Sequence, residues 1–198
     1  MIALDLHIST FFLLYVLITI IEYVIWKRQE RKIYFLAIMV LTLYLMLLFK
    51  VGICPITYLR PENRQEFTKV FGDYIQYYQL VPFKTIISNF QNNVWISQVL
   101  GNVILLFPVP LLYSFLVKEI PGRKTLIFLG AMVSLSIEII QFGIDVIGHY
   151  PSHVADIDDF ILNTVGVTVS TIVLYFIQEK EFYSKIKQRF RKEEICMQ

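Results

Sequence analysis

The residues of this sequence that could bind a ligand or transfer a proton stand at helical spacing in and beside long apolar runs. One set steps by 4, 3, 4 and 4 residues, and at about 100° per residue it falls on one stripe of a helix; it comprises Ser134, Glu138, Gln141, Asp145 and His149. A second set steps by 3, 4 and 7 residues along the next run, with Asp158 pointing elsewhere; it comprises Asp156, Asp159, Asn163 and Ser170. Gln98 and Asn102 share a face of an earlier run. These stripes predict polar faces on three helices.

Chemistry at these faces depends on the carboxylates, because ionisable groups inside apolar segments are costly and mark functional sites by default. Carboxylates that cluster at one end of a helix bundle repel one another unless a cationic group joins them. We therefore favour contact with a ligand for these acids. Hydrogen bonding between packed helices is the simpler explanation for lone Asn and Ser side chains such as Asn102 and Ser134. The predicted ligand-binding set is Asn102, Glu138, Gln141, Asp145, His153, Asp156, Asp159 and Asn163.

Metal binding and catalysis are the alternatives for the same residues. His149, His153, Asp156 and Asp159 supply metal-ligating atoms, but their spacing matches no zinc signature, so no metal and no cofactor are expected. Glu138 and Asp159 could act as general acid and base on a lipid-linked substrate. The sequence holds no Ser-His-Asp arrangement, P-loop or HExxH motif, so no catalytic residue is named and a non-enzymatic protein is favoured.

The composition says which elements position these residues. Of 198 residues, 56% are hydrophobic and 17% charged, with a mean hydropathy of +0.59; an ordinary soluble domain is about 45–50% apolar and about 25% charged. Apolar lengths sufficient for membrane spans occur at 8–26, 33–53, 96–117, 125–147 and 159–177. The alternation of a membrane barrel is absent. We therefore predict an all-α polytopic membrane protein with five transmembrane helices, the first of them an uncleaved span.

Basic residues set the expected orientation, because loops on the cytoplasmic side carry the excess of Lys and Arg. Thirteen of them lie in the first and third connections and the C-terminal tail, and five on the other side. This split predicts that the N-terminus lies outside and the C-terminus in the cytoplasm. Cys54 and Cys196 then lie on opposite sides of the membrane and cannot form a disulfide. The polar faces then lie in the outer half, as a crevice open to the exterior between the last three spans. No ionisable path continues inward, which argues against a pump or channel, and the net charge of +2 is too small to suggest nucleic acid.

The long second loop, 54–95, is too aromatic for a floppy linker. Apolar and aromatic residues recur there at helical spacing: Phe67, Val70, Phe71, Tyr74 and Tyr78. We predict a helix on the outer membrane surface followed by a Pro-marked turn at Leu80–Lys84, with an ordinary ectodomain loop as the alternative. The chain thus divides into two N-terminal spans with the start of this loop (1–78), a core of three spans (79–177) and a basic tail attracted to anionic lipid (178–198).

Four segments of the core resemble the VanZ-like family of bacterial membrane proteins. They are Val81-Pro82-Phe83-Lys84, residues 101–108 (GNVILLFP), residues 134–141 (SLSIEIIQ) and residues 156–166 (DIDDFILNTVG). The resemblance covers about residues 79–177 in the family's order. His153 stands where the family usually has Arg, Gln79 where it has Asn, and Pro110 where it has Gly. The missing Arg leaves the acidic mouth without its usual cation.

The resemblance implies a multi-pass protein of the bacterial cell membrane. Its founding member is associated with resistance to the glycopeptide teicoplanin. We therefore expect an envelope protein that modulates susceptibility to lipid-anchored glycopeptides, with membrane lipids and a lipid-linked cell-wall precursor or the glycopeptide itself as partners. An enzyme acting on a lipid-linked precursor is the alternative, and a scaffold without a ligand is the third.

Overall fold

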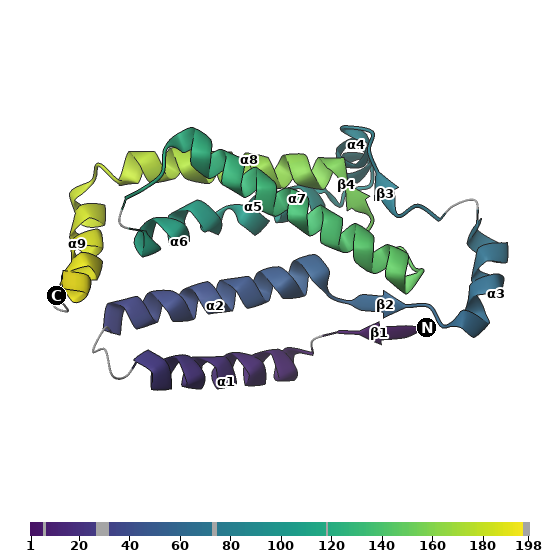
Figure 1. Ribbon diagram of the computed structural model, residues 1–198. Helices are drawn as coiled ribbons and strands as arrows, with labels where there is room; N and C mark the ends of the chain where they lie inside the picture. The colour runs from purple at the N-terminus through teal and green to yellow at the C-terminus, as the bar shows by residue number, and fades with distance from the viewer. Residues whose placement is uncertain (6, 27–31, 73–74, 118, 196–198) are drawn as a thin grey trace.

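A computed structural model describes residues 1–5, 7–26, 32–72, 75–117 and 119–195 of the chain. Five helices in it are long and apolar enough to cross a membrane, as the sequence predicts (Figure 1). The five segments are Ile8–Ile25, Phe35–Ile53, Ile96–Leu116, Arg123–Gly148 and Ile157–Ile177. The all-α polytopic architecture is confirmed.

The helices are joined by short strands and surface helices. α1 (Ile8–Trp26) and α2 (Lys32–Ile53) form the first pair, and α7 (Arg123–Gly148) and α8 (Ile157–Ile177) form the last. Between them lie α3 (Pro61–Phe71), α4 (Lys84–Gln91), η3 (Ile96–Leu100), α5 (Gly101–Leu106) and α6 (Pro108–Leu116), and α9 (Glu181–Ile195) ends the described chain. The strands are β1 (Ile2–Leu4), β2 (Ile56–Tyr58), β3 (Tyr78–Gln79) and β4 (Ala155–Asp156).

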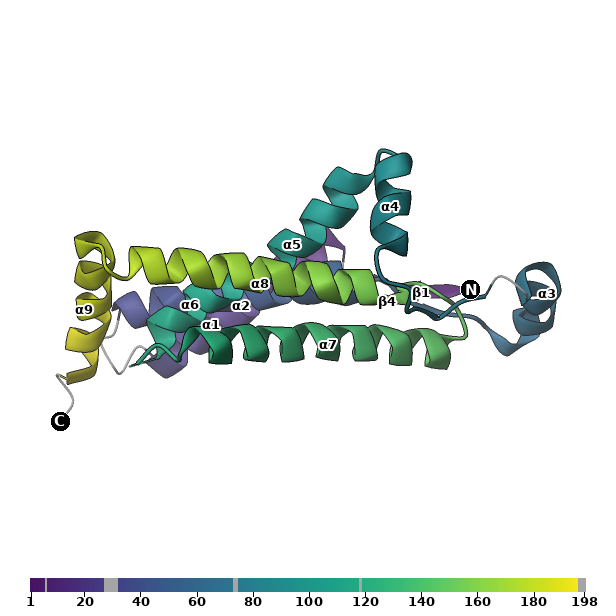
Figure 2. The ribbon, with the colours of Figure 1, turned by 90° about the horizontal axis from the view of Figure 1, so that it is seen from above.

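The third span, predicted as one helix over 96–117, is broken into η3, α5 and α6. It begins with a π-helical turn, and α5 ends at Leu106, just before Pro108. Proline has no N–H for the helical hydrogen bond and its ring clashes with the preceding turn, so helices kink or end there. Figure 2 shows α4 and α5 projecting to one side of the α7–α8 pair.

α8 is the most buried of the five spans and packs against α5, α6 and α7. Two glycines allow this close approach. A Cβ at Gly166 would lie 2.0 Å from the carbonyl oxygen of Val103, and one at Gly130 would lie 2.4 Å from Cγ1 of Val167. Small residues at helix contacts let backbones come together, which is how membrane helices gain packing energy without a hydrophobic driving force.

The two ends of the bundle differ in their elements. Figure 1 places the N-terminus, the strands, α3 and α4 at one end, which we call the carboxylate end, and α9 with the C-terminus at the other, the α9 end. At the carboxylate end β1 pairs antiparallel with β2 (Ala3 opposite Thr57), and β3 pairs parallel with β4 (Gln79 opposite Asp156). Strands of two or three residues are too short to produce a recognisable alternation of apolar and polar residues, so the sequence predicts none of them.

The long loop contains a surface helix, but not over the whole predicted stripe. α3 begins at Pro61, whose fixed φ suits a first helical position, and ends at Phe71 with Gly72 as its C-cap. Phe67 and Phe71 lie on it and their rings are 5.1 Å apart. Tyr78 lies in β3 instead, because its backbone pairs with β4, and Tyr74 lies outside the described residues. A second helix, α4, follows the Pro-marked turn.

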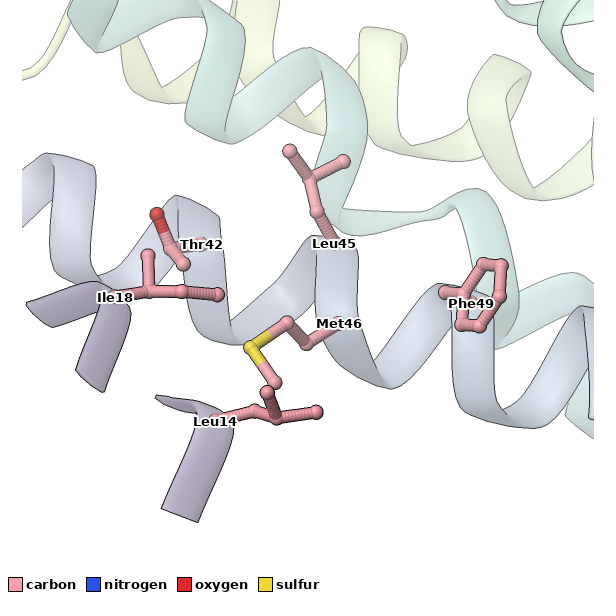
Figure 3. A pocket seen from close by; sticks show the side chains of 6 residues that line it. All are labelled: Leu14, Ile18, Thr42, Leu45, Met46 and Phe49. Atoms are coloured by element: carbon pink, nitrogen blue, oxygen red, sulfur yellow. The ribbon is translucent and has the colours of Figure 1, made fainter. Parts of the chain in front are cut away.

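α1 and α2 line an open, largely apolar hollow of about 370 Å³ (Figure 3). The residues lining it come from both helices: Leu14, Ile18, Thr42, Leu45, Met46 and Phe49. Near it, the Thr42 hydroxyl donates a hydrogen bond to Oε1 of Glu22 over 2.5 Å. The sequence reasoning passed over Glu22, although an acid inside the first apolar run is itself a signal.

Candidate functional site

Asp145, in the last turn of α7, holds the loop that follows this helix. Its side chain is fully buried. It accepts hydrogen bonds from the backbone N–H groups of Ser152, at 3.0 Å, and His153, at 3.2 Å to Oδ2. His149 ends the helix in the left-handed region with φ 53° and turns the chain back toward this carboxylate. Asp145 therefore shapes the loop before β4, and two backbone donors satisfy its buried oxygens.

Glu138 and Asp156 join α7 to the start of α8. The backbone N–H of Asp156 donates to Oε2 of Glu138 over 2.9 Å. Asp156 is in turn the N-cap of α8, since its Oδ1 accepts from the backbone N–H of Asp158 over 2.9 Å. An N-cap carboxylate satisfies a helix donor that has no partner within the helix and lies at the positive end of the dipole.

Asp156 also contacts the long loop. Its Oδ2 accepts a hydrogen bond from the Thr85 hydroxyl over 2.5 Å, and the Gln79 amide lies 3.4 Å from its Oδ1. One side chain thus caps α8 and fastens the beginning of α4 and the end of β3 to it.

Asp158 is the functional residue that the sequence reasoning set aside. It lies off the face shared by Asp156 and Asp159, as predicted, but its side chain is 0% exposed. Its two oxygens accept from three backbone N–H groups at the start of α4: Phe83 at 2.5 Å, Thr85 at 2.9 Å and Ile86 at 3.1 Å. The available signal was indirect, because the sequence before α4 supplies no Ser, Thr, Asp or Asn as N-cap and a distant carboxylate fills that role.

Asp159 and Asn102 connect α8 to α5. The Asn102 amide donates to Oδ1 of Asp159. Asp159 also lies within electrostatic range of Glu138 and Asp156, so these carboxylates form one cluster. One turn further along α8, Asn163 is 1% exposed, and its Oδ1 has no hydrogen-bond partner among the described residues.

The predicted set therefore divides into parts. Asn102, Glu138, Asp156 and Asp159 come together, and Asn163 follows on the same face of α8. Asp145 and His153 form a separate backbone clamp. Gln141 bonds to a different element, because its amide donates to the carbonyl of Gly52 on α2 over 2.8 Å. Within the described part of the chain, no three His, Cys, Asp or Glu side chains are arranged to hold a metal ion.

A bundle of five apolar helices with hydrogen-bonded carboxylates at one end defines an all-α, multi-pass membrane protein. Comparison with family models makes the class specific: the chain belongs to the VanZ/LLP1 family, whose model matches residues 33–178. No curated protein and no solved structure matches the chain. The association with glycopeptide resistance holds at the level of the family.

The family match begins at α2 and leaves α1 out, whereas the motifs seen in the sequence begin at Val81. Three of those four motif segments meet through hydrogen bonds: the Pro-marked turn contacts Asp158, and Glu138 contacts Asp156. The 101–108 segment joins them through Asn102. Segments that resemble the family are thus far apart in the chain and adjacent in the fold.

Proposed function

We propose that this protein is a non-enzymatic membrane protein of the bacterial envelope that modulates susceptibility to lipid-anchored glycopeptides such as teicoplanin. It acts by binding an amphiphile or a cell-wall precursor at the carboxylate end, which the basic-residue asymmetry predicts to lie outside. Family membership supports the link to glycopeptides.

The hydrogen bonds that the carboxylates accept are the observation that supports a non-enzymatic protein. Asp145, Asp156 and Asp158 each accept at least two hydrogen bonds from backbone or side-chain donors. A carboxylate whose oxygens already accept hydrogen bonds from several protein donors is poorly placed to exchange a proton with a substrate. The acids therefore serve best as fixed supports for the surface turn above them, and that turn presents apolar side chains where an amphiphile inserts.

An enzyme acting on a lipid-linked precursor is the second candidate, and one observation favours it. Glu138 and Asp159 each have one oxygen engaged by a described donor, which leaves the other oxygen of each for proton transfer. Their mutual proximity is the arrangement that a pair of acid and base would need.

The deciding experiment compares teicoplanin with vancomycin, which lacks the acyl tail, in cells carrying wild type, Glu138→Gln, Asp159→Asn or no protein. Glu179→Gln, at an exposed acid near α9, is the matched control. The proposal expects wild type and Glu179→Gln to shift teicoplanin susceptibility and leave vancomycin unchanged. Equal susceptibility of the wild-type and protein-free strains would refute it.

Mass spectrometry of a lipid-linked precursor incubated with purified protein separates binding from catalysis. An unchanged precursor mass supports binding. A mass change that wild type produces and both carboxamide variants abolish assigns the protein to the enzymes, because a carboxamide keeps the shape and removes proton transfer.

A further inference from the structure

The turn between β3 and α4 is held more firmly than a surface loop requires. The Gln79 side chain bonds both backbone groups of Val81: its Oε1 accepts from the N–H over 2.6 Å, and its Nε2 donates to the carbonyl over 2.8 Å. Three N–H groups after Pro82 donate to the buried Asp158. Phe83 lies in the left-handed region with φ 66°, a conformation that is unfavourable for a bulky residue and that persists only where the surrounding structure holds it in place.

This fixed turn exposes apolar side chains. Leu80 is 66% exposed, Val81 58% and Phe83 56%. A flexible loop would fold such side chains inward, but the hydrogen bonds to Gln79 and Asp158 prevent this. A rigid apolar ridge at the end of membrane-spanning helices is suited to contact acyl chains at the membrane interface.

A hollow of about 350 Å³ lies beside the ridge, lined by residues 75–81 and by Lys84. Lys84 is exposed and makes no ion pair with any residue that the structure describes. Asp156 and Asp158, which fasten the start of α4, accept hydrogen bonds from neutral donors, and neither forms an ion pair with Lys84 in the described part of the chain. Gln76, Tyr77 and Tyr78 also line the hollow, and their side chains carry amide and hydroxyl groups that can donate hydrogen bonds.

We propose that this hollow binds the phosphate headgroup of a membrane amphiphile. The Lys84 ammonium pairs with a phosphate oxygen, the amide and phenol donors bond the others, and the alkyl chain lies against Leu80, Val81 and Phe83. A phosphate monoester carries nearly two negative charges and three acceptor oxygens, so it uses one cation with several neutral donors better than a carboxylate does. The inference deepens the proposed function by naming the headgroup chemistry, and it rests on the same end of the molecule.

Isothermal titration of the purified full-length protein in uncharged maltoside micelles tests the inference, with decyl phosphate as probe. We expect wild type to bind decyl phosphate at least tenfold more tightly than inorganic phosphate, which has no chain, and than decyltrimethylammonium, which has the opposite charge. Lys84→Gln should weaken decyl phosphate binding about tenfold or more, the loss of one charge-assisted contact. Lys84→Arg should keep binding within about threefold, because the cation remains.

Lys69→Gln is the matched control, since Lys69 is an exposed lysine on α3 of the same loop. It should bind decyl phosphate as wild type does. Because the Lys84 side chain is exposed, Lys84→Gln should also melt at the wild-type temperature. Unchanged affinity of Lys84→Gln for decyl phosphate would overturn the inference. Equal binding of inorganic phosphate and decyl phosphate would also overturn it, as would tighter binding of decyltrimethylammonium, which would show that this hollow prefers cations.

This test contains no antibiotic, so its failure is separate from failure of the proposed function. Loss of decyl phosphate binding in Lys84→Gln, with no effect of the protein on teicoplanin, would keep the headgroup site and remove the resistance role. Intact decyl phosphate binding in Lys84→Gln, with an effect of the protein on teicoplanin susceptibility, would remove the headgroup site and keep the resistance role.

Discussion

The two ends of the bundle are held together by different forces. At the carboxylate end, buried acids from α7 and α8 accept hydrogen bonds from backbone N–H groups of other segments, as Asp158 does from the start of α4. At the α9 end, Leu126, Leu174 and Tyr183 form a buried cluster, and the ring of Phe115 lies 5.4 Å from that of Tyr183. Substitution of a hydrogen-bonded buried acid removes bonds that few other side chains can replace. Substitution of a buried apolar side chain matters mainly through the change in volume.

The difference suggests a division of roles. The α9 end docks a basic helix across the bundle (Figure 2), and packing of a few apolar side chains is enough for this. The carboxylate end fixes the turn before α4 and the β3–β4 pair in place, as the proposed binding surface would require.

Accessibility to a membrane-impermeant thiol reagent should separate the ends completely. With the carboxylate end outside, Cys196 should stay unlabelled in intact cells and react after lysis. Glu62→Cys, at an exposed position of α3, provides the positive control and should react before lysis. Cys54 is buried and should stay silent in both cases. Labelling of Cys196 in intact cells would reverse the orientation and place the proposed site in the cytoplasm.

Removal of the Asp158 carboxylate should be the most damaging substitution at the carboxylate end. Asp158→Ala leaves three N–H groups without their partner, at about 1–3 kcal/mol for each that stays buried, so we expect a loss of roughly 3–5 kcal/mol. Asp158→Asn keeps one acceptor oxygen and should lose about half of this. Reversible unfolding in mixed maltoside and dodecyl sulfate micelles measures both. Glu119→Ala, at an exposed acid, should change stability by less than about 0.5 kcal/mol.

A loss below about 1 kcal/mol for Asp158→Ala would contradict the capping role. The same variants should also release the turn, so Phe83 should become more accessible to proteolysis in Asp158→Ala than in wild type. Unchanged cleavage together with lost stability would place the effect elsewhere in α8.

At the α9 end, volume should matter more than identity. Leu174 is fully buried, and Leu174→Ala should cost about 3 kcal/mol through lost burial and the cavity left behind. Leu174→Met keeps the volume and should cost less than about 1.5 kcal/mol. The same unfolding experiment measures both. If the near-isosteric Leu174→Met costs more than the near-isosteric Asp158→Asn, the contrast between the two ends is wrong.

Much of the fold could be predicted from the sequence because apolar length fixes a membrane span almost alone. The predicted span 8–26 coincides with α1, and 33–53 begins one residue after α2 does. The break in the third span was not predicted, although Pro108 was visible, because an apolar window averages over it. The strand pairs depend on contacts between residues far apart in sequence, such as Tyr78 and Ala155, and leave no local pattern.

Helical periodicity predicted which side chains share a face but not what each face contacts. Asn102 and Asp159, from different helices, meet as the stripes predict. Gln141 shares the stripe of Glu138 but lies at its edge and bonds α2 instead. Asp158 was missed because its partners are backbone N–H groups, and any sequence supplies these. Backbone donors become specific only when the fold leaves them without a partner.

The smallest effect is expected at the exposed ion pair of α9. Lys185 Nζ lies 2.7 Å from Oε1 of Glu181, one helical turn away, and both side chains are largely exposed. Such a pair contributes about 0.3–0.5 kcal/mol and is screened by salt. Glu181→Gln should therefore lower stability by no more than about 0.5 kcal/mol in low salt and have no measurable effect in 0.5 M NaCl, a concentration at which the Debye length is about 4 Å.

A salt-independent loss above about 1 kcal/mol would mean that a charge helps to fix α9, and the contrast with the carboxylate end would narrow. Asp158→Asn should keep its full effect at the same salt concentration, because its partners are buried hydrogen-bond donors and not mobile surface charges.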